Sequence, residues 1–288
     1  MASSACIVCG APRAGSEEHT RVRSNVRAFR EEKFDYWRCG KCGSIHAEDE
    51  VDLAHYYARY PFHALAMDWR LRAMYSRQVA RLVAAGVEKS HRVLDYGCGG
   101  GQLVRYMQSL GFDNVRGYDE YSSEFGDKRV LDERYDCIVS QDVIEHVAEP
   151  QALLSRFREL TRPGAVVAVG TPSAGAIDLS RPEDFVHTIH APYHRHILSK
   201  QALVATGERQ GFSLARYYST MYSNTRVPFL NEAFYFYYTR ITDGTLDALM
   251  EPVRAGALLL RAPVTLFWGL FGYFFSRHTD VMAIFKRP

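Results

Sequence analysis

The sequence predicts an α/β protein whose core is a doubly wound parallel sheet. Between residues 91 and 218, short apolar runs alternate with segments of helical periodicity, and turns separate them. A glycine cluster within residues 97–101 joins the first apolar run to the first helix. Glycines in such a turn accept positive φ angles and let a ligand approach bare backbone. The pattern therefore predicts a ligand site where the strands end.

The composition allows one large domain and a small module in the 288 residues. The 35 basic and 33 acidic residues give a formal charge of +2, which indicates no general preference for polyanions. Six cysteines are too few for a disulfide scaffold of this length. The first residues, Met-Ala-Ser-Ser-Ala-Cys, lack a basic region followed by an apolar run, so we expect no secretory signal and a reducing, cytoplasmic location.

Residues 1–50 carry two Cys-x-x-Cys-Gly pairs, Cys6/Cys9 and Cys39/Cys42. Two such pairs can complete a tetrahedral sulfur site, which suits Zn²⁺. The segment resembles a zinc ribbon with a structural ion; redox-active or chance cysteines are the alternative. The arginines of this module indicate either an RNA contact or, more commonly, a solvated basic face; they are Arg21, Arg23, Arg27 and Arg30.

Residues 51–90 form a connector that begins with aromatic residues and continues into a predicted helix over 65–85. The aromatic part contains Tyr56, Tyr57 and Tyr60, which either contact a ligand or only pack.

The core, residues 91–218 and 278–288, begins with the strand that contains Asp95. The next predicted strand ends in Asp119, 24 positions later. In nucleotide sites of this architecture an acid at about that distance binds ribose hydroxyls. Asp95 precedes the glycines, where its charge would repel a pyrophosphate but would suit an ammonium group.

The segment from Val93 to Gly101 resembles the first motif of class I S-adenosylmethionine-dependent methyltransferases. This resemblance implies a seven-stranded Rossmann-like sheet, and it implies that the connector helix covers the cofactor. It assigns cofactor contacts to Asp95, Gly97, Gly99, Gly101, Asp119, Gln141 and Asp142. Only residues 120–134 separate the second strand from the strand over 135–142, where the family normally fits a helix and a third strand. The adenine contacts therefore stay open.

Asp142, Glu145 and His146 lie about one helical turn apart and could hold Mg²⁺, Mn²⁺ or Zn²⁺. The string resembles the Glu-His-Val signature of ubiquinone-biosynthesis O-methyltransferases. It also resembles the metal motif of small-RNA 3′-terminal 2′-O-methyltransferases. Structural hydrogen bonding without a metal is the alternative.

Four histidines follow the fifth predicted strand: His187, His190, His194 and His196. In the resembled family this loop borders the acceptor, so a neutral imidazole there can act as a base. We favour His194 as the base, with His190 and His146 as the other candidates. His194 and His196 could instead complete the metal site.

Residues 219–277 are rich in aromatic residues and include the apolar stretch 255–275. Arg261 and Pro263 interrupt this stretch, and residues 280–286 resemble the family's last antiparallel strand, which must return to the sheet. We therefore predict a helical lid rather than a membrane span. Its apolar face either closes an acceptor pocket or lies on a membrane surface.

The sequence thus predicts an S-adenosylmethionine-dependent methyltransferase for a small-molecule or lipid-linked acceptor, with O- or C-methylation favoured. One alternative is a metal-assisted RNA 2′-O-methyltransferase, although nucleic acid is the less expected partner. The other is a methyltransferase-like binding module without catalysis.

Overall fold

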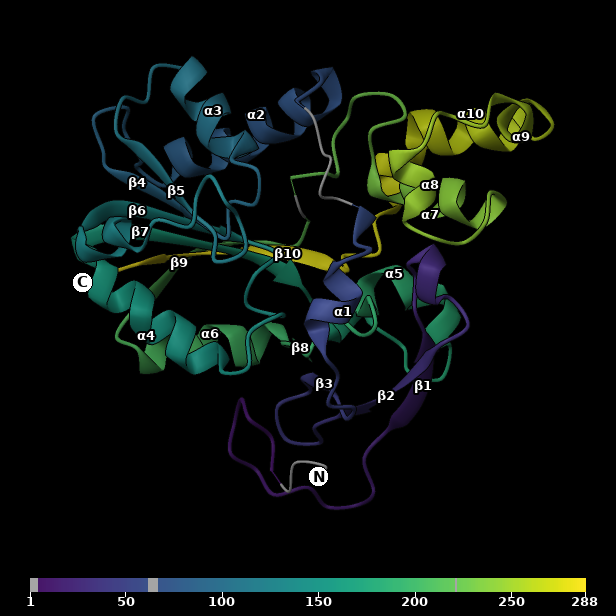
Figure 1. The fold of residues 1–288 in the computed structure, drawn as a ribbon, viewed down its shortest axis with the longest axis horizontal. Coiled ribbons are helices and arrows are strands. Elements are labelled where there is room, and N and C mark those ends of the chain that lie inside the picture. The colour runs from purple at the N-terminus through teal and green to yellow at the C-terminus, as the bar shows by residue number, and fades with distance from the viewer. Residues whose placement is uncertain (1–4, 62–66, 221) are drawn as a thin grey trace.

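The computed structural model describes residues 5–61, 67–220 and 222–288, with the backbone alone at residue 257. It contains a six-stranded sheet flanked by helices, a four-stranded antiparallel sheet near the N-terminus, and a group of helices late in the chain (Figure 1).

The main sheet has the strand order β5-β4-β6-β7-β10-β9. Strands β4 to β7 are parallel, whereas β10 is antiparallel to both of its neighbours. The bounds are β4 Val93–Tyr96, β5 Val115–Tyr118, β6 Tyr135–Gln141, β7 Thr161–Pro172, β9 Ser213–Tyr218 and β10 Asp280–Lys286. The α/β class and the return of the last strand to the sheet are confirmed.

The predicted seventh strand is absent from the described part of the chain. Residues 120–134 contain only a 3-10 helix, η3 (Lys128–Asp132), and the sheet ends at β5. The segment is too short for a helix and another strand, so it crosses directly from β5 to β6.

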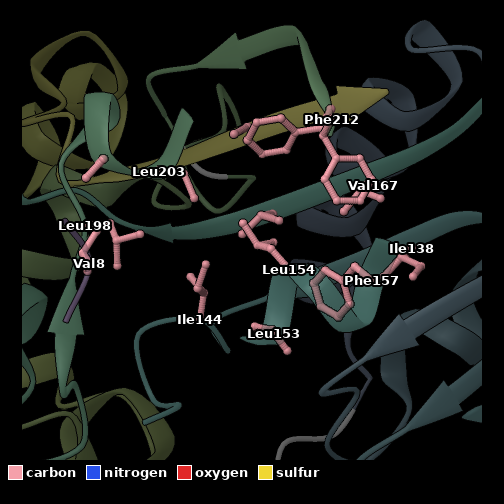
Figure 2. Packing of buried hydrophobic residues seen from close by; sticks show 14 of the residues in the cluster. Val8, Ile138, Ile144, Leu153, Leu154, Phe157, Val167, Leu198, Leu203 and Phe212 are labelled. Carbon is pink, nitrogen blue, oxygen red and sulfur yellow. The ribbon is translucent and has the colours of Figure 1, made fainter. Parts of the chain in front are cut away.

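Helices cover both faces of this sheet. In Figure 1, α2 (Trp69–Ala84) and α3 (Gln102–Ser109) lie above it, and α4 (Pro150–Leu160) and α6 (Lys200–Arg209) lie below. Figure 2 shows the lower interface, where α4 packs against strands β6 and β7 through Leu154 and Phe157, which are fully buried. Helix α2 begins at Trp69 after the N-cap Asp68; residue 65, where we expected it to begin, lies outside the described residues.

The N-terminal sheet has the order β1-β2-β3-β8. Its strands are β1 His19–Arg23, β2 Lys33–Arg38 and β3 Ile45–Ala47, with the 3-10 helix η1 (Arg27–Phe29) between the first two. The fourth strand, β8 (His196–Ile197), comes from the core. Val8 is buried in the same cluster as α4, and its carbonyl oxygen accepts hydrogen bonds from Gln151 and Arg209. The N-terminal module is therefore joined to the core by pairing and by packing.

Short elements connect these parts. Helix α1 (Leu53–Tyr57) follows the module, and η4 (Ala174–Ala176), η5 (Pro182–Phe185) and α5 (Val186–Ile189) follow β7. Between β9 and β10 lie α7 (Glu232–Ile241), α8 (Asp247–Met250), α9 (Ala255–Leu259), α10 (Ala262–Phe271) and η6 (Gly272–Phe275). These late helices form a small cluster of their own, to one side of the sheet (Figure 1). Within the described residues, no helix combines the length and the apolar character that crossing a bilayer requires.

Candidate functional site

The glycine turn leads from β4 to α3. Gly97, Gly99 and Gly101 have φ angles of 80°, 53° and 73°, which other residues rarely adopt. A Cβ on Gly97 would lie 2.2 Å from Val143 Cγ2, and one on Gly101 would lie 2.2 Å from Phe125 Cζ. The turn thus requires glycine at these two positions for conformation and for space.

Two carboxylates meet this turn from neighbouring strands. Asp95 is buried, and its burial, with a smaller contribution from Asp119, raises its pKa to about 7. Asp119 follows β5, and its two oxygens accept the N–H groups of Gly99 and Tyr121, both at 2.9 Å. Each carboxylate oxygen of Asp119 has a second lone pair that can accept from a ligand hydroxyl.

The end of β6 forms the next side of the site. Asp142 has a φ of 56°, and its Oδ1 accepts a hydrogen bond from Gln141 Nε2 at 3.0 Å. Asp142 keeps contact with solvent although protein atoms crowd around it, and this desolvation raises its pKa to about 6. Helix α2 adds Gln78, whose Nε2 lies 3.5 Å from Gln141 Oε1.

Tyr75, also on α2, lies near both Asp95 and Asp142. Burial and these two carboxylates raise its pKa. Tyr75 and Gln78 were not predicted as site residues, because their helix precedes the first core strand in the sequence. Their spacing of three positions, which places both on one helix face, was the available signal.

A second group of side chains, called the Glu145 group below, consists of Glu145, His146 and His194. One ligand atom from each lies within 4.8 Å of the others. Glu145 is fully buried; its Oε2 accepts from Thr171 Oγ1 at 2.9 Å, and its Oε1 has no hydrogen-bond partner within the described residues. His194 Nε2 lies 3.9 Å from that Oε1. The group combines one carboxylate with two imidazoles.

The hydrogen bonds of the two imidazoles differ. His194 Nδ1 lies 2.9 Å from the carbonyl oxygen of Thr188, which only accepts, so this Nδ1 carries the proton and Nε2 has the lone pair. His146 Nδ1 lies 3.0 Å from the carbonyl oxygen of Tyr193 and 3.1 Å from the Tyr57 hydroxyl, so it has both an acceptor and a donor within reach. Burial lowers the pKa of His146 to about 4, and burial with the neighbouring imidazoles lowers that of His194 well below its ordinary value. Both rings are therefore neutral at physiological pH.

The structure separates the residues that we expected to act together. Asp142 is not part of the Glu145 group, because residues 142–146 form a turn with left-handed backbone at Asp142 rather than a helical turn. His190 uses both ring nitrogens, with Asn25 Oδ1 at 2.7 Å and the Tyr60 hydroxyl at 3.3 Å. His196 lies in the antiparallel sheet, where its Nδ1 is 3.0 Å from His46 Nδ1. His187 lies beside Asn25.

The connector tyrosines also differ in their surroundings. The Tyr57 hydroxyl lies 3.1 Å from His146 Nδ1, and the Tyr57 ring stacks on Tyr121. Tyr57 therefore bridges the two parts of the site. The Tyr56 hydroxyl instead donates to Glu32 in the N-terminal module.

The four cysteines of the module gather at one point, with their sulfur atoms within 4.8 Å of one another. The two turns have the same geometry: Gly10 N donates to Cys6 O, and Gly43 N donates to Cys39 O, both at 2.8 Å. The glycines have φ angles of 70° and 71°. This arrangement can present four thiolates to one ion, as tetrahedral Zn²⁺ sites do.

Carboxylates accompany each of the module's arginines. Arg21 pairs with Asp35 and Arg30 with Glu31, both at 3.1 Å, and Arg23 pairs with Glu183 at 2.9 Å. Arg27 contacts Asp243 and Glu251 in the late helices. These arginines stabilise contacts within the protein and form no exposed row of unpaired charge.

The similarity to known proteins is concentrated in the core. One relative is a ubiquinone biosynthesis O-methyltransferase of Cereibacter sphaeroides, 33% identical over 100 residues, which are 28% of this chain and 40% of the relative. A protein of the same name from Parvibaculum lavamentivorans has the same identity and coverage. The chain thus matches less than half the length of these relatives.

Among solved structures, phosphoethanolamine N-methyltransferase 2 of Haemonchus contortus, in complex with S-adenosyl-L-methionine, is 16% identical. The match covers 85% of this chain and 62% of that one, with a TM-score of 0.48, values too low to support a functional argument. The sequence model of the family described as "Methyltransferase domain" matches residues 67–217, which include the glycine turn, Asp119 and the Glu145 group. The chain belongs to this methyltransferase-domain family.

Proposed function

We propose that this chain is an S-adenosylmethionine-dependent methyltransferase that acts on an oxygen of a small-molecule or lipid-linked acceptor. The observation that carries the proposal is the meeting of Asp95, Asp119 and the glycine turn at the carboxyl ends of β4 and β5. The names of the partial relatives support oxygen as the acceptor atom.

The charges of the site fit the parts of this cofactor. Asp95 would face the ammonium group of the methionine end, and Asp119 would accept hydrogen bonds from the ribose. The glycines leave room for the cofactor against the backbone, while Tyr75, Gln78 and Gln141 border the same space. When bound, the cofactor supplies an electrophilic methyl group on a sulfonium. The protein then has to align the acceptor and exclude water.

In this proposal the Glu145 group removes the proton from the acceptor's hydroxyl. Neutral imidazoles can accept a proton, and with a carboxylate they can also bind a divalent ion. Two nitrogen donors suit Zn²⁺ or Mn²⁺ better than Mg²⁺. An ion held there would favour the ionised form of a nearby hydroxyl. In this proposal His194 remains the preferred base, or becomes a ligand if an ion is present.

The four cysteines hold a structural Zn²⁺ in this proposal. All four ligands come from the protein, so no position is left for a reacting group. Their site supports the sheet that β8 joins. RNA methylation is disfavoured, because the module's arginines are paired with carboxylates and a strand of phosphates needs unpaired positive charge.

The late helices contact a membrane surface in this proposal. The exposed large apolar residues here are Leu259, Leu260, Val264, Leu266, Phe267, Leu270, Phe271, Phe274 and Phe275. Such a patch on one surface is typical of interaction sites. Residues 252–279 contain three arginines and no acid, a composition that favours anionic lipid. A membrane contact would explain this exposure better than a lid, because a lid would bury these side chains.

Calorimetric titration with S-adenosylhomocysteine tests the central proposal. Asp119→Ala removes two charge-assisted ribose hydrogen bonds, each worth about 1.5–3 kcal/mol, so the affinity should fall about a hundredfold or more. Glu120→Ala is the matched control, since Glu120 is an exposed acid on the neighbouring position. A wild type that does not bind would support a non-catalytic module. Equal affinities for all three proteins would refute the assignment of Asp119. A screen of lipid and metabolite extracts for labelled methyl transfer would then find the acceptor.

A further inference from the structure

A cavity of about 430 Å³ lies between α2 and the residues that follow β9. Arg77 and Arg81, one turn apart on α2, line it together with Tyr218, Ser219 and Thr220. The two guanidinium groups therefore point to the same space, and two hydroxyl groups lie opposite them.

No carboxylate balances these arginines. Within the described residues neither makes an ion pair, and the residues left out, 1–4, 62–66 and 221, include no aspartate or glutamate. Arg81 is only 5% exposed, and Arg81 Nη1 and Arg77 Nε are buried without a hydrogen-bond partner among the described residues. Their Nη2 atoms lie 3.3 and 3.5 Å from Thr220 Oγ1. Arg81 also lies over the ring of Tyr218, 4.4 Å from its centroid. A buried charge without an opposite charge is costly, so an anion would stabilise this site.

A third arginine lies near this pair. Burial and the neighbouring Arg77 lower the pKa of Arg81 to about 10, which leaves it charged at physiological pH. Arg77 and Arg226 both lie over the Tyr273 ring, 5.6 and 5.2 Å from its centroid, and they lower the pKa of Tyr273.

The two arginines lie next to parts of the chain that the proposed function uses. Their helix also carries Tyr75 and Gln78, which border the cofactor side. Arg77 lies over the ring of Tyr273 in η6, whose next residues, Phe274 and Phe275, are exposed. A molecule with an apolar part on η6 and a reactive group near the cofactor would place its middle at Arg77 and Arg81.

We propose that Arg77, Arg81 and Thr220 bind a phosphate group of the acceptor. Guanidinium groups bind phosphate oxygens in pairs of hydrogen bonds, and Thr220 adds a donor. This inference rests on the proposed function, because it takes the acceptor to be the source of the phosphate, and it defines the acceptor class as phosphate-bearing.

Calorimetry with inorganic pyrophosphate, at constant ionic strength, tests the site. Arg77→Gln and Arg81→Gln should each weaken binding at least tenfold. Arg72→Gln is the matched control, because it removes an exposed arginine of the same helix, and it should change binding less than twofold. A wild type that does not bind pyrophosphate, or variants that bind it as the wild type does, would overturn the proposal.

A melting experiment separates a binding role from a structural one. Pyrophosphate should raise the melting temperature of the wild type and of Arg72→Gln, and leave that of Arg81→Gln unchanged. If Arg81 only supports the fold through Tyr218 and Thr220, Arg81→Gln will lower the melting temperature and the shift caused by pyrophosphate will remain, which would overturn the proposal.

Cosedimentation with phosphatidic acid vesicles distinguishes the sources of the phosphate. Weaker vesicle binding by Arg81→Gln indicates a lipid headgroup, whereas an effect confined to pyrophosphate indicates a soluble phosphate ester; both results support a phosphate site. Titration with S-adenosylhomocysteine keeps the two proposals apart. A protein that binds this nucleoside but not pyrophosphate retains the proposed function and loses only this inference.

Discussion

Single residues set the chemistry of the cofactor site through their burial. Asp95 is almost fully enclosed, and neither an arginine nor a lysine forms an ion pair with it among the described residues. Its pKa of about 7 means that the protonated and ionised forms are present in similar amounts near neutral pH in the protein without ligand. A ligand ammonium would supply the missing positive charge and favour the carboxylate.

This residue predicts a pH dependence of cofactor binding. Below its pKa of about 7, Asp95 must lose its proton before it can face an ammonium group. That step costs about 1.36 kcal/mol per pH unit, so affinity for S-adenosylhomocysteine should be about tenfold weaker at pH 6 than at pH 8. Calorimetry at the two pH values measures this. Asp95→Asn should bind weakly at both, and a wild-type affinity that does not change with pH would contradict the role of Asp95.

His194 and Glu145 predict a binding property as well as a rate. If they hold a divalent ion, equilibrium dialysis should find one bound Mn²⁺ or Zn²⁺ beyond the cysteine site, lost in Glu145→Gln and His194→Gln. His187→Gln is the control, because His187 lies beside Asn25 and outside this group.

If no ion binds, His194→Gln should still lower turnover about a hundredfold, as loss of a general base does, with cofactor affinity kept. Unchanged metal content together with unchanged turnover would exclude both roles for His194.

At the scale of elements, the N-terminal sheet depends on two matching turns. Each holds two cysteines in a fixed geometry, and the sheet continues through β8 into the loop that carries His194. His46, on β3, lies 3.2 Å from Cys6 Sγ and contacts His196 on β8. The cysteine site and the histidine loop are therefore joined through these two imidazoles.

The cysteine site predicts a bound zinc ion whose loss lowers the stability of the protein. Elemental analysis should find one zinc per chain, and the double variant Cys39→Ser/Cys42→Ser should contain none. Because ion binding and folding of such sites are linked, the variant should also be less stable to heat. Cys98→Ser, at a cysteine outside the cluster, should keep its zinc. A folded wild type without zinc would rule out the structural ion.

At the scale of the whole molecule, the late helices expose a large apolar surface. They form a separate cluster beside the sheet (Figure 1). Many of their large apolar side chains are exposed. Salt bridges from Arg27 to Asp243 and Glu251 hold them against the N-terminal module.

Flotation with lipid vesicles measures the predicted membrane contact. The wild type should bind vesicles containing phosphatidylglycerol and bind pure phosphatidylcholine less well. Burial of a phenylalanine contributes about 1.5–3 kcal/mol, so Phe271→Ser/Phe274→Ser should reduce partitioning at least tenfold. Trp69→Ser is the control, since Trp69 is 63% exposed on another helix. Equal binding by the double variant and the wild type would argue against a membrane contact through α10 and η6.

The sequence by itself determined the features that depend on neighbouring residues. The apolar runs predicted strands β4, β5 and β6 to within about two residues, because burial of a parallel strand requires a continuous apolar segment. The resemblance to the methyltransferase family predicted β10. The glycine turn was predicted from the residue type itself, because glycine is the residue that most readily adopts positive φ angles. The two cysteine pairs predicted one cluster from their spacing.

Only the tertiary structure decided which distant residues meet. His194 reaches Glu145 and His146, whereas His196, two residues on, lies in β8 and pairs with His46 of β3. The sheet ends at β5 in the described residues, because the 15 residues that connect β5 to β6, 120–134, form only a 3-10 helix and no further strand. Helix α2 brings Tyr75 and Gln78 to the cofactor side and Arg77 and Arg81 to the cavity. Which face of a helix meets which strand is set by packing across the whole fold, and local sequence patterns do not carry that information.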